Sequence, residues 1–313
     1  MLNKTVSKRN WYKNVLVINT IFLILLIPIC TNISNAENQK QNLNIYTVNY
    51  PLQYFAERIG DDKVNVYFPV PSDVDPAFWS PKREVVRQYQ QADLILLNGA
   101  DYAKWIDKAT LPKSKLLNTS KSFKADYIPL KDTVTHSHGP SGEHAHGEVA
   151  FTTWLDPLLA IKQADSIKEA FIKMMPESKD SFIRNYESLR KDLEDLNNKI
   201  LNIVSSNPKE PLLSSHPVYQ YLARRYDLNL KSVHWEPDEM PGADQLKELN
   251  IILENHPAMW MIWEDEPRVE IKDLLAEMHI QSAVFNPCSN DPGTGNYMEV
   301  MNKNADNLKQ VFN

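Results

Sequence analysis

Histidines are the side chains of this chain best suited to binding a metal ion, and four of the eight lie within eleven positions. They form two His-x-His pairs, His136 with His138 and His144 with His146, in the Gly-, Ser- and Pro-punctuated segment 132–149. Neutral imidazole is a good ligand for zinc, copper and nickel. The segment is therefore predicted to be a mobile metal-binding loop of modest affinity, because binding would order it and cost conformational entropy. The alternative is a solvated loop with incidental histidines.

A fifth candidate ligand, His216, follows the apolar run 211–215 and precedes the amphipathic stretch 218–226. Ligands of open α/β sheets bind outside the carboxyl ends of the strands, where this histidine is expected to lie. The alternative is a histidine that caps a helix or is buried for structural reasons. The remaining histidines are isolated in sequence and are expected to be structural or exposed: His234, His256 and His279.

Acidic and aromatic side chains accompany these histidines near predicted strand ends and loops. The candidate oxygen ligands are Asp73, Asp75, Asp156, Glu236 and Glu264, although most acids in such places are solvated or cap helices. Trp79 and Trp235 neighbour candidate residues, which predicts an aromatic-lined cleft, whereas the usual place of Trp is the core.

No motif in the sequence indicates catalysis. There is no Gly-rich phosphate loop, no Gly-x-Ser-x-Gly elbow and no His-Glu-x-x-His helix. Cys288 is the one cysteine after position 36, its setting matches no nucleophile motif, and a buried, unreactive thiol is expected. We therefore predict a binding protein and not an enzyme, with a hydrolase on an α/β scaffold as the rival.

Short apolar runs alternate with amphipathic stretches in two sets, which predicts βαβ units and two parallel-sheet α/β lobes. Strands are expected at 45–48, 64–70, 93–98, 115–118, 211–215, 229–234, 259–264 and 281–286. Helices are expected at 51–59, 80–91, 218–226, 243–255, 267–278 and 297–311. The predicted organisation is an N-terminal lobe over 37–175, a linking helix over 176–206 and a C-terminal lobe over 207–313.

The linking helix carries the clearest periodicity in the chain. Apolar residues recur there at steps of four and three: Phe182, Tyr186, Leu189, Leu193, Leu196, Ile200 and Ile203. One apolar stripe on a helix of about 27 residues is typical of a rod lying along both lobes, and it is short for a coiled-coil arm. Such a rod restricts hinge motion, because bending a helix breaks its hydrogen-bond ladder.

Residues 1–36 are predicted to be an export signal. Four basic residues without acids precede an apolar stretch at 15–29, and Ser34-Asn35-Ala36 offers small residues for cleavage. A retained membrane anchor and a lipid-anchored Cys30 are the alternatives. Without this segment the chain keeps 30 of its 34 Lys and Arg against 40 Asp and Glu, which argues against nucleic acid or an anionic membrane as the partner.

Several short stretches occur together in a specific order and spacing. They are 59–64 (IGDDKV), Val74-Asp75-Pro76, Ala92-Asp93-Leu94-Ile95 with Asn98-Gly99, Trp154-Leu155-Asp156-Pro157, His216, 221–226 (YLARRY), Glu236-Pro237 and Met301-Asn302-Lys303-Asn304. From about Ile45 to the C-terminus, the chain resembles on these stretches the zinc/manganese-type (cluster A-I) substrate-binding proteins of ABC importers. The His-rich segment ahead of Trp154 is similar to that of the zinc-type members.

The resemblance implies two α/β lobes joined by a long rigid helix. It also implies a monomer, periplasmic or otherwise extracytoplasmic, that captures a divalent metal, zinc first, and hands it to a membrane permease. The sequence departs from the family's usual ligands. Ala77 and Thr152 stand where the family usually has histidines, and Asn286-Pro287-Cys288 stands in place of a late Asp-Pro-Leu stretch. Of the three usual histidines, His216 alone remains.

Three outcomes are open for the missing ligands. The loop histidines fold over the cleft and replace them, with His144 and His146 as first recruits because His146 lies six residues before Thr152. Alternatively, the cleft binds a metal complex or an organic ligand, or the loop alone binds metal, as in a periplasmic chaperone or buffer. We favour the first outcome, with His216 as the cleft ligand. Because ligand histidines must be neutral, affinity is expected to fall below about pH 6.5.

Overall fold

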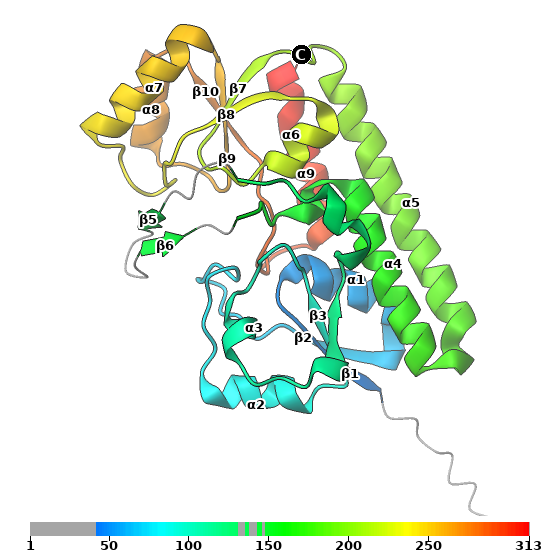
Figure 1. The fold of residues 1–313 in the computed structure, drawn as a ribbon. Coiled ribbons are helices and arrows are strands. Elements are labelled where there is room, and N and C mark those ends of the chain that lie inside the picture. Colours follow the sequence, from blue (N-terminus) through cyan, green and yellow to red (C-terminus); the bar gives the residue numbers. More distant parts are fainter. Residues whose placement is uncertain (1–41, 131–134, 138–142, 146–147, 313) are drawn as a thin grey trace, which may run out of the picture. The chain divides into compact units, whose positions relative to one another are not determined.

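The computed structural model describes residues 42–130, 135–137, 143–145 and 148–312 of the 313-residue chain. The predicted export signal, His138 and His146 therefore lie outside the described residues. Two α/β lobes, each built on a four-stranded parallel sheet, are joined by helices that run along one side of both lobes (Figure 1). The predicted fold class is confirmed.

The N-terminal lobe holds a sheet in the order β2-β1-β3-β4, and all its pairings are parallel. Its strands are β1 (Leu43–Thr47), β2 (Val64–Tyr67), β3 (Leu94–Leu97) and β4 (Leu116–Asn118). Its helices are α1 (Tyr50–Gly60), α2 (Arg83–Gln91) and α3 (Trp105–Lys108). The uninterrupted apolar run of β3 is typical of a central strand that is covered on both faces.

The C-terminal lobe holds a second parallel sheet, in the order β10-β9-β7-β8. Its strands are β7 (Pro211–Ser214), β8 (Asn229–Ser232), β9 (Trp260–Trp263) and β10 (Gln281–Val284). Its helices are α6 (Gln220–Tyr226), α7 (Ala243–Asn255), α8 (Val269–Glu277) and α9 (Tyr297–Phe312). All eight strands expected from the sequence are confirmed, with ends that shift by a few residues.

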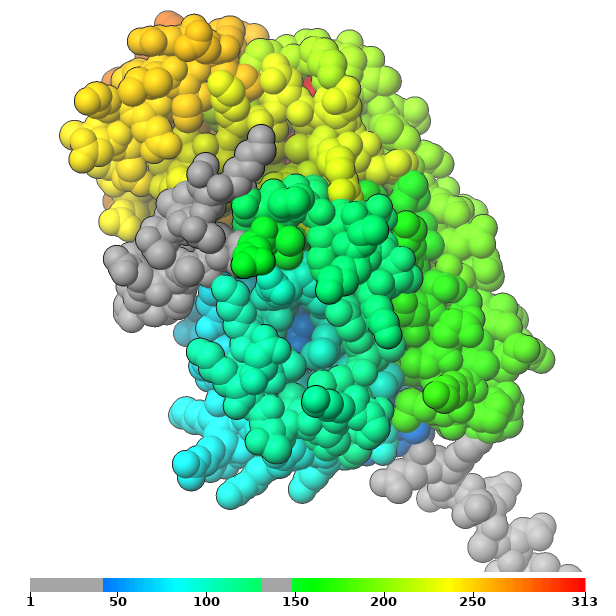
Figure 2. All heavy atoms as spheres, viewed as in Figure 1, coloured from blue at the N-terminus to red at the C-terminus, as the bar shows by residue number. Residues whose placement is uncertain are grey.

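The long helix α5 (Lys179–Val204) follows a 3-10 turn at Pro176–Ser178 and packs against helices of both lobes, α1 on one side and α6 and α9 on the other. Six of the seven stripe residues are buried, and Ile203 is partly buried. An ion pair also joins it to each lobe, to α1 between Asp192 and Arg58 at 2.7 Å and to α9 between Lys199 and Asp306 at 3.0 Å. The helix therefore lies along both lobes as predicted (Figures 1 and 2).

A second helix on this side, α4 (Pro157–Met174), is absent from the sequence-based prediction. Asp156 begins it by accepting a hydrogen bond from Leu158 N at 2.9 Å, and Pro157 takes the first helical position, where a missing N–H costs nothing. Ala160, Gln163 and Ala164 are among its buried residues. These small or polar residues weaken the apolar stripe by which a helix is recognised.

The His-rich segment contains two short paired strands, whereas the sequence predicted a loop. β5 (Thr135–Ser137) and β6 (Glu143–Ala145) pair antiparallel, with His136 opposite His144. An antiparallel bridge between Pro129 and Val149 pairs the residues that flank this segment. In the part of the chain that the structure describes, no helix has the length and apolar character needed to cross a membrane.

Candidate metal site

His216 lies where three neighbouring strands of the C-terminal sheet end. Strand β7 ends two residues before it, and β7 lies between β9 and β8. Glu264 follows β9 directly, and Glu236 follows β8 after a short turn. Parallel strands present their carboxyl ends at one edge of a sheet, so the fold brings together three side chains that lie far apart in sequence.

Each ring nitrogen of His216 faces one carboxylate. Nε2 lies 3.3 Å from Oε1 of Glu236, and Nδ1 lies 3.3 Å from Oε1 of Glu264. The histidine is only 5% exposed, whereas the side chains of Glu236 and Glu264 are 29% and 35% exposed. We call these three residues the His216 cluster. It is anchored in the protein through its imidazole and open to solvent through its carboxylates.

Backbone hydrogen bonds fix the position of this histidine. Ser215 N donates to Ile262 O at 2.9 Å, and Ser215 O accepts from Trp235 N at 2.9 Å, which ties the segment to both neighbouring strands. The carbonyl of His216 accepts from Val218 N at 2.9 Å. The imidazole is therefore held in place before any ligand arrives, which lowers the entropic cost of binding.

The charges around His216 favour a cation. Burial lowers the pKa of the imidazole, but the carboxylates of Glu236 and Glu264 and the charge of Asp75 outweigh it, and the pKa of His216 is raised above its ordinary value. Without metal, His216 therefore keeps its proton to a higher pH than a free histidine does, and an incoming metal ion must displace that proton. Metal affinity is therefore expected to begin falling at a pH above the value of about 6.5 that the sequence suggested.

Asp75 is the acidic contribution of the N-terminal lobe to this site. It lies after β2, and its Oδ1 accepts a hydrogen bond from Ala77 N at 2.8 Å. Ala77 and Thr152, the positions of two usual family histidines, are both buried. The Thr152 hydroxyl donates to Val218 O at 2.5 Å, which joins the two lobes beside His216. Neither position can supply a nitrogen ligand.

Asn286 and Cys288 are linked by a local hydrogen bond. Asn286 accepts a hydrogen bond from Cys288 N through Oδ1 at 2.7 Å. Cys288 is buried, and burial together with the charge of Asp291 raises the pKa of its thiol to about 12. A metal-binding thiolate is therefore disfavoured, in agreement with the unreactive thiol expected from the sequence.

Asp156 takes the helix-capping alternative, and the tryptophans correct one expectation. Asp156 caps α4, and the nearest Arg225 nitrogen lies 3.9 Å away, so this acid is structural. Trp235 is fully buried in the core of the C-terminal lobe and cannot line a cleft. Trp79 packs edge-on against Trp105, with ring centroids 6.0 Å apart. The prediction of an aromatic-lined cleft was wrong for Trp235, because its side chain packs in this core beside Trp263.

The three isolated histidines have different surroundings. His256 is buried, with Nε2 3.0 Å from Leu212 O, and His279 is exposed at the end of α8, as expected. His234, which sequence reasoning set aside as structural or exposed, is half-buried with its ring centroid 6.1 Å from that of His216. Its position as the last residue of the strand predicted at 229–234, just before Trp235-Glu236, was the signal that could have linked it to the site.

Among the side chains that the structure describes, no three from His, Cys, Asp and Glu converge on one point where an ion could sit. By itself, the His216 cluster is therefore not a complete metal site. The backbone of the hairpin places His136 and His144 opposite each other, while His138 and His146 lie outside the described residues.

Residues 45–311 match the model of one protein family, ZnuA, described as the periplasmic component A of a zinc-uptake complex. The chain belongs to the ZnuA family. Membership covers both lobes and the helix between them, so the family resemblance drawn from the short motifs is confirmed.

Curated relatives of this ZnuA-family chain include proteins of Streptococcus pneumoniae and Bacillus subtilis. It is 28% identical over 307 residues to the zinc-binding lipoprotein AdcA of Streptococcus pneumoniae strain R6, covering 92% of this chain and 60% of AdcA. It is 27% identical over 306 residues to the high-affinity zinc uptake system protein ZnuA of Bacillus subtilis, covering 91% of this chain and 93% of that protein. The chain thus spans about three fifths of the length of AdcA.

Solved structures share the fold. The metal-dependent lipoprotein YcdH of Bacillus subtilis superposes with a TM-score of 0.75 at 23% identity, over 87% of this chain and 100% of that one. Zn(II)-bound AdcA of Streptococcus pneumoniae gives a TM-score of 0.73 at 23% identity, over 87% of this chain and 58% of that one. At this level of identity the likeness concerns the architecture of the two lobes.

Proposed function

We propose that this ZnuA-family chain is an extracytoplasmic receptor that captures a divalent metal ion, zinc above all, and passes it to the permease of an ABC importer. The His216 cluster carries the proposal, because a preset imidazole with a carboxylate at each ring nitrogen is suited to a cation and to little else. Two relatives bear names that refer to zinc binding or zinc uptake, which supports zinc as the ion. No bond is made or broken in this role.

His216 and Glu236 are spaced as neighbouring ligands of one zinc ion. Zinc takes imidazole nitrogen and carboxylate oxygen at about 2.0–2.2 Å in tetrahedral sites, which places adjacent donor atoms about 3.3–3.5 Å apart. The 3.3 Å between Nε2 and Oε1 of Glu236 fits this spacing. Nε2 is the ring nitrogen farther from the backbone and the easier one for an ion to reach, so we assign Glu236 as the second ligand.

Glu264 then orients the imidazole. A histidine that binds metal through one nitrogen commonly donates its other N–H to a carboxylate, which fixes the tautomer and raises ligand basicity. Oε1 of Glu264, 3.3 Å from Nδ1, is placed for this role. Asp75 adds negative charge that draws a cation toward the site.

The remaining ligands are assigned to the His-rich segment: His144 and His146 first, with His136 and His138 as further donors. Residues opposite one another in an antiparallel pair have Cα atoms roughly 4.5–5.5 Å apart, and His136 and His144 are such a pair. The base of this hairpin, at Val149, lies three residues before Thr152, which bonds to Val218 beside His216. The hairpin thus departs from the chain close to the cluster.

A receptor of this kind works as a monomer outside the cytoplasm and meets the importer's permease. Relatives named as lipoproteins support the alternative in which Cys30 carries a lipid anchor, over simple cleavage after residue 36. Metabolic labelling with a fatty acid in cells, compared with Cys30→Ala, separates the two: label on the wild type alone indicates the anchor.

Metal analysis and competition titration of the purified mature chain test the proposal. We expect one zinc ion to bind tightly, and His216→Ala to weaken binding by more than the roughly 10–100-fold that loss of an outer-shell partner costs. Deleting residues 136–146 should weaken binding without abolishing it. The exposed His279→Ala is the matched control and should leave the affinity unchanged.

Two results would contradict this assignment. A chain that stays empty in excess zinc, manganese, copper and nickel is no metal receptor. If the deletion of 136–146 abolishes binding while His216→Ala has no effect, the protein acts as a metal buffer through its His-rich segment alone.

A further inference from the structure

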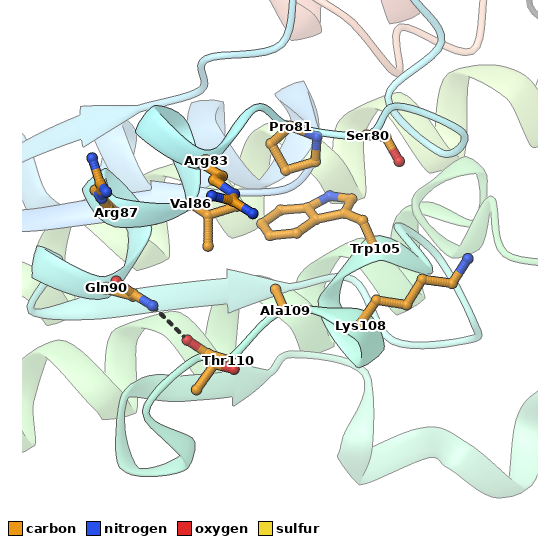
Figure 3. Close-up of a pocket in the computed structure, with 10 residues that line it drawn as sticks. All are labelled: Ser80, Pro81, Arg83, Val86, Arg87, Gln90, Trp105, Lys108, Ala109 and Thr110. Carbon is orange, nitrogen blue, oxygen red and sulfur yellow. Dashed lines mark hydrogen bonds between the residues drawn. The ribbon is translucent and has the colours of Figure 1, made fainter.

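A second candidate site lies in the N-terminal lobe, away from the His216 cluster. A cavity of about 610 Å³ opens between α2 and α3. The side chains that line it are Ser80, Pro81, Arg83, Val86, Arg87, Gln90, Trp105, Lys108, Ala109 and Thr110. Figure 3 shows the indole of Trp105 in the middle of this lining, with Arg83 on the α2 side and Lys108 on the α3 side. Its volume falls in the range of roughly 300–1,000 Å³ that small-molecule sites occupy.

The charge of the lining is entirely positive. Arg83, Arg87 and Lys108 contribute three cations, and no acid belongs to the lining. None of the three forms an ion pair with the described residues, although such pairs are common elsewhere on this chain. The side-chain amide of Gln90, which also lines the cavity, already donates a hydrogen bond from Nε2 to Thr110 O at 2.8 Å. The cations are therefore available to a ligand.

The same region stands out in the sequence. Residues 80–126 hold nine Lys and Arg against five Asp and Glu, in a chain whose net charge is −6. Lys82 and Arg83 occupy the cap and first position of α2, and no side chain caps this helix end. Cations are unfavourable at the positive end of a helix dipole. Glu84 is the one acidic residue in the first turn of α2. A local rule broken in this way is expected at functional or strained sites.

We infer that this cavity, which we call the Arg83 pocket, binds a small anion that carries phosphate groups. Guanidinium groups present forked donors that match phosphate oxygens in pairs, and Lys108 adds a point charge. Trp105 is 7% exposed and contributes an apolar part of the lining between these cations. The Arg83 pocket is independent of the metal site: it shares no residue with the His216 cluster.

Calorimetric titration of the metal-free mature chain with inorganic pyrophosphate, at low ionic strength, tests the inference. We expect saturable one-to-one binding that weakens as salt is added. The double variant Arg83→Gln/Arg87→Gln should lower the affinity at least about tenfold, since it removes both forked donors. The control Lys121→Gln/Lys124→Gln removes the same charge from the same stretch outside the pocket and should bind as the wild type does.

A parallel sedimentation assay with phosphatidylglycerol vesicles identifies the source of the phosphate. Binding to vesicles but not to pyrophosphate, lost in the arginine variant alone, assigns the Arg83 pocket to a lipid headgroup. Pyrophosphate binding without vesicle binding assigns it to a soluble phosphate compound. The inference is overturned if neither probe binds at millimolar concentration, or if the arginine and lysine variants lose binding equally, because attraction would then be general and not sited. Zinc binding serves as the folding check and should be unchanged in both variants.

Discussion

The two sheets of this protein end in different chemistry at equivalent edges. In the N-terminal lobe, the residues after β1, β3 and β4 include Asn49, Asn98 and Thr119, which are neutral and fully buried. In the C-terminal lobe, the residues after β7, β8 and β9 include His216, Glu236 and Glu264, which ionise. One architecture thus places amides and a hydroxyl at one edge and an imidazole with two carboxylates at the other.

Partners explain the difference. Gln163 of α4 donates from Nε2 to Asn98 Oδ1 at 3.1 Å and to Thr119 Oγ1 at 3.0 Å, and Asn98 Nδ2 donates to Phe151 O at 2.8 Å. These groups satisfy one another inside the lobe and hold α4 against the sheet. The acids of the His216 cluster reach solvent instead. We therefore expect metal capture to depend on the His216 cluster and the His-rich segment, with no ligand from the edge of the N-terminal sheet.

The sharpest test of this asymmetry is the pair Glu236→Gln and Glu264→Gln. Each substitution removes one carboxylate charge next to the His216 imidazole and keeps the shape of the side chain. We expect zinc affinity to fall roughly 10–100-fold in each, and further for Glu236 if it is the direct ligand. Competition titration measures the loss. Unchanged affinity in both variants would remove the carboxylates from the site.

The matching change on the other edge is Asn98→Ala. It leaves buried partners without hydrogen bonds, each costing about 1–3 kcal/mol, so the free energy of unfolding should drop by roughly 2–4 kcal/mol. Zinc affinity of the folded protein should stay within about twofold of the wild type. Denaturant unfolding and zinc titration on the same sample provide the two numbers. A large loss of zinc affinity with little loss of stability would place the N-terminal edge in the site.

The pH dependence also separates the two edges, because His216 titrates at the C-terminal edge while the named N-terminal residues are neutral. Its raised pKa means that it stabilises the metal-free fold below about pH 6.5, and that this stabilisation is lost as pH rises through the higher folded value. Zinc affinity should change in the opposite sense, falling as pH drops below that raised pKa. Unfolding curves of wild type and His216→Gln over pH 5–9 should converge at high pH. Parallel curves at all pH values would contradict the raised pKa.

The smallest effect is expected from Cys288→Ala. The thiol is buried with a pKa of about 12, so it gives no thiolate to a metal at neutral pH. Zinc affinity should be unchanged, and stability should fall by no more than about 1 kcal/mol, the order of one small buried group. Equilibrium dialysis against zinc measures the affinity. A marked loss of affinity would show that Cys288 contributes to the metal site in addition to the His216 cluster.

Local patterns in the sequence predicted the two sheets and the linking helix because strands and stripes repeat over short distances. Helix α4 escaped prediction because buried Ala and Gln interrupt its stripe. The His-rich segment pairs with itself through a register that spacing alone does not reveal. His216 was recognised as a ligand candidate, but its union with Glu236 and Glu264 depends on β7 lying between β8 and β9, and strand order is a property of the whole lobe.

X-ray absorption at the zinc edge of the zinc-loaded mature chain shows which atoms bind the ion and whether His216 is one of the ligands. We expect a first shell of nitrogen and oxygen at about 2.0–2.2 Å that includes imidazole, without sulfur near 2.3 Å, and a smaller imidazole contribution in His216→Ala. An unchanged spectrum in His216→Ala, or a sulfur shell, would contradict it.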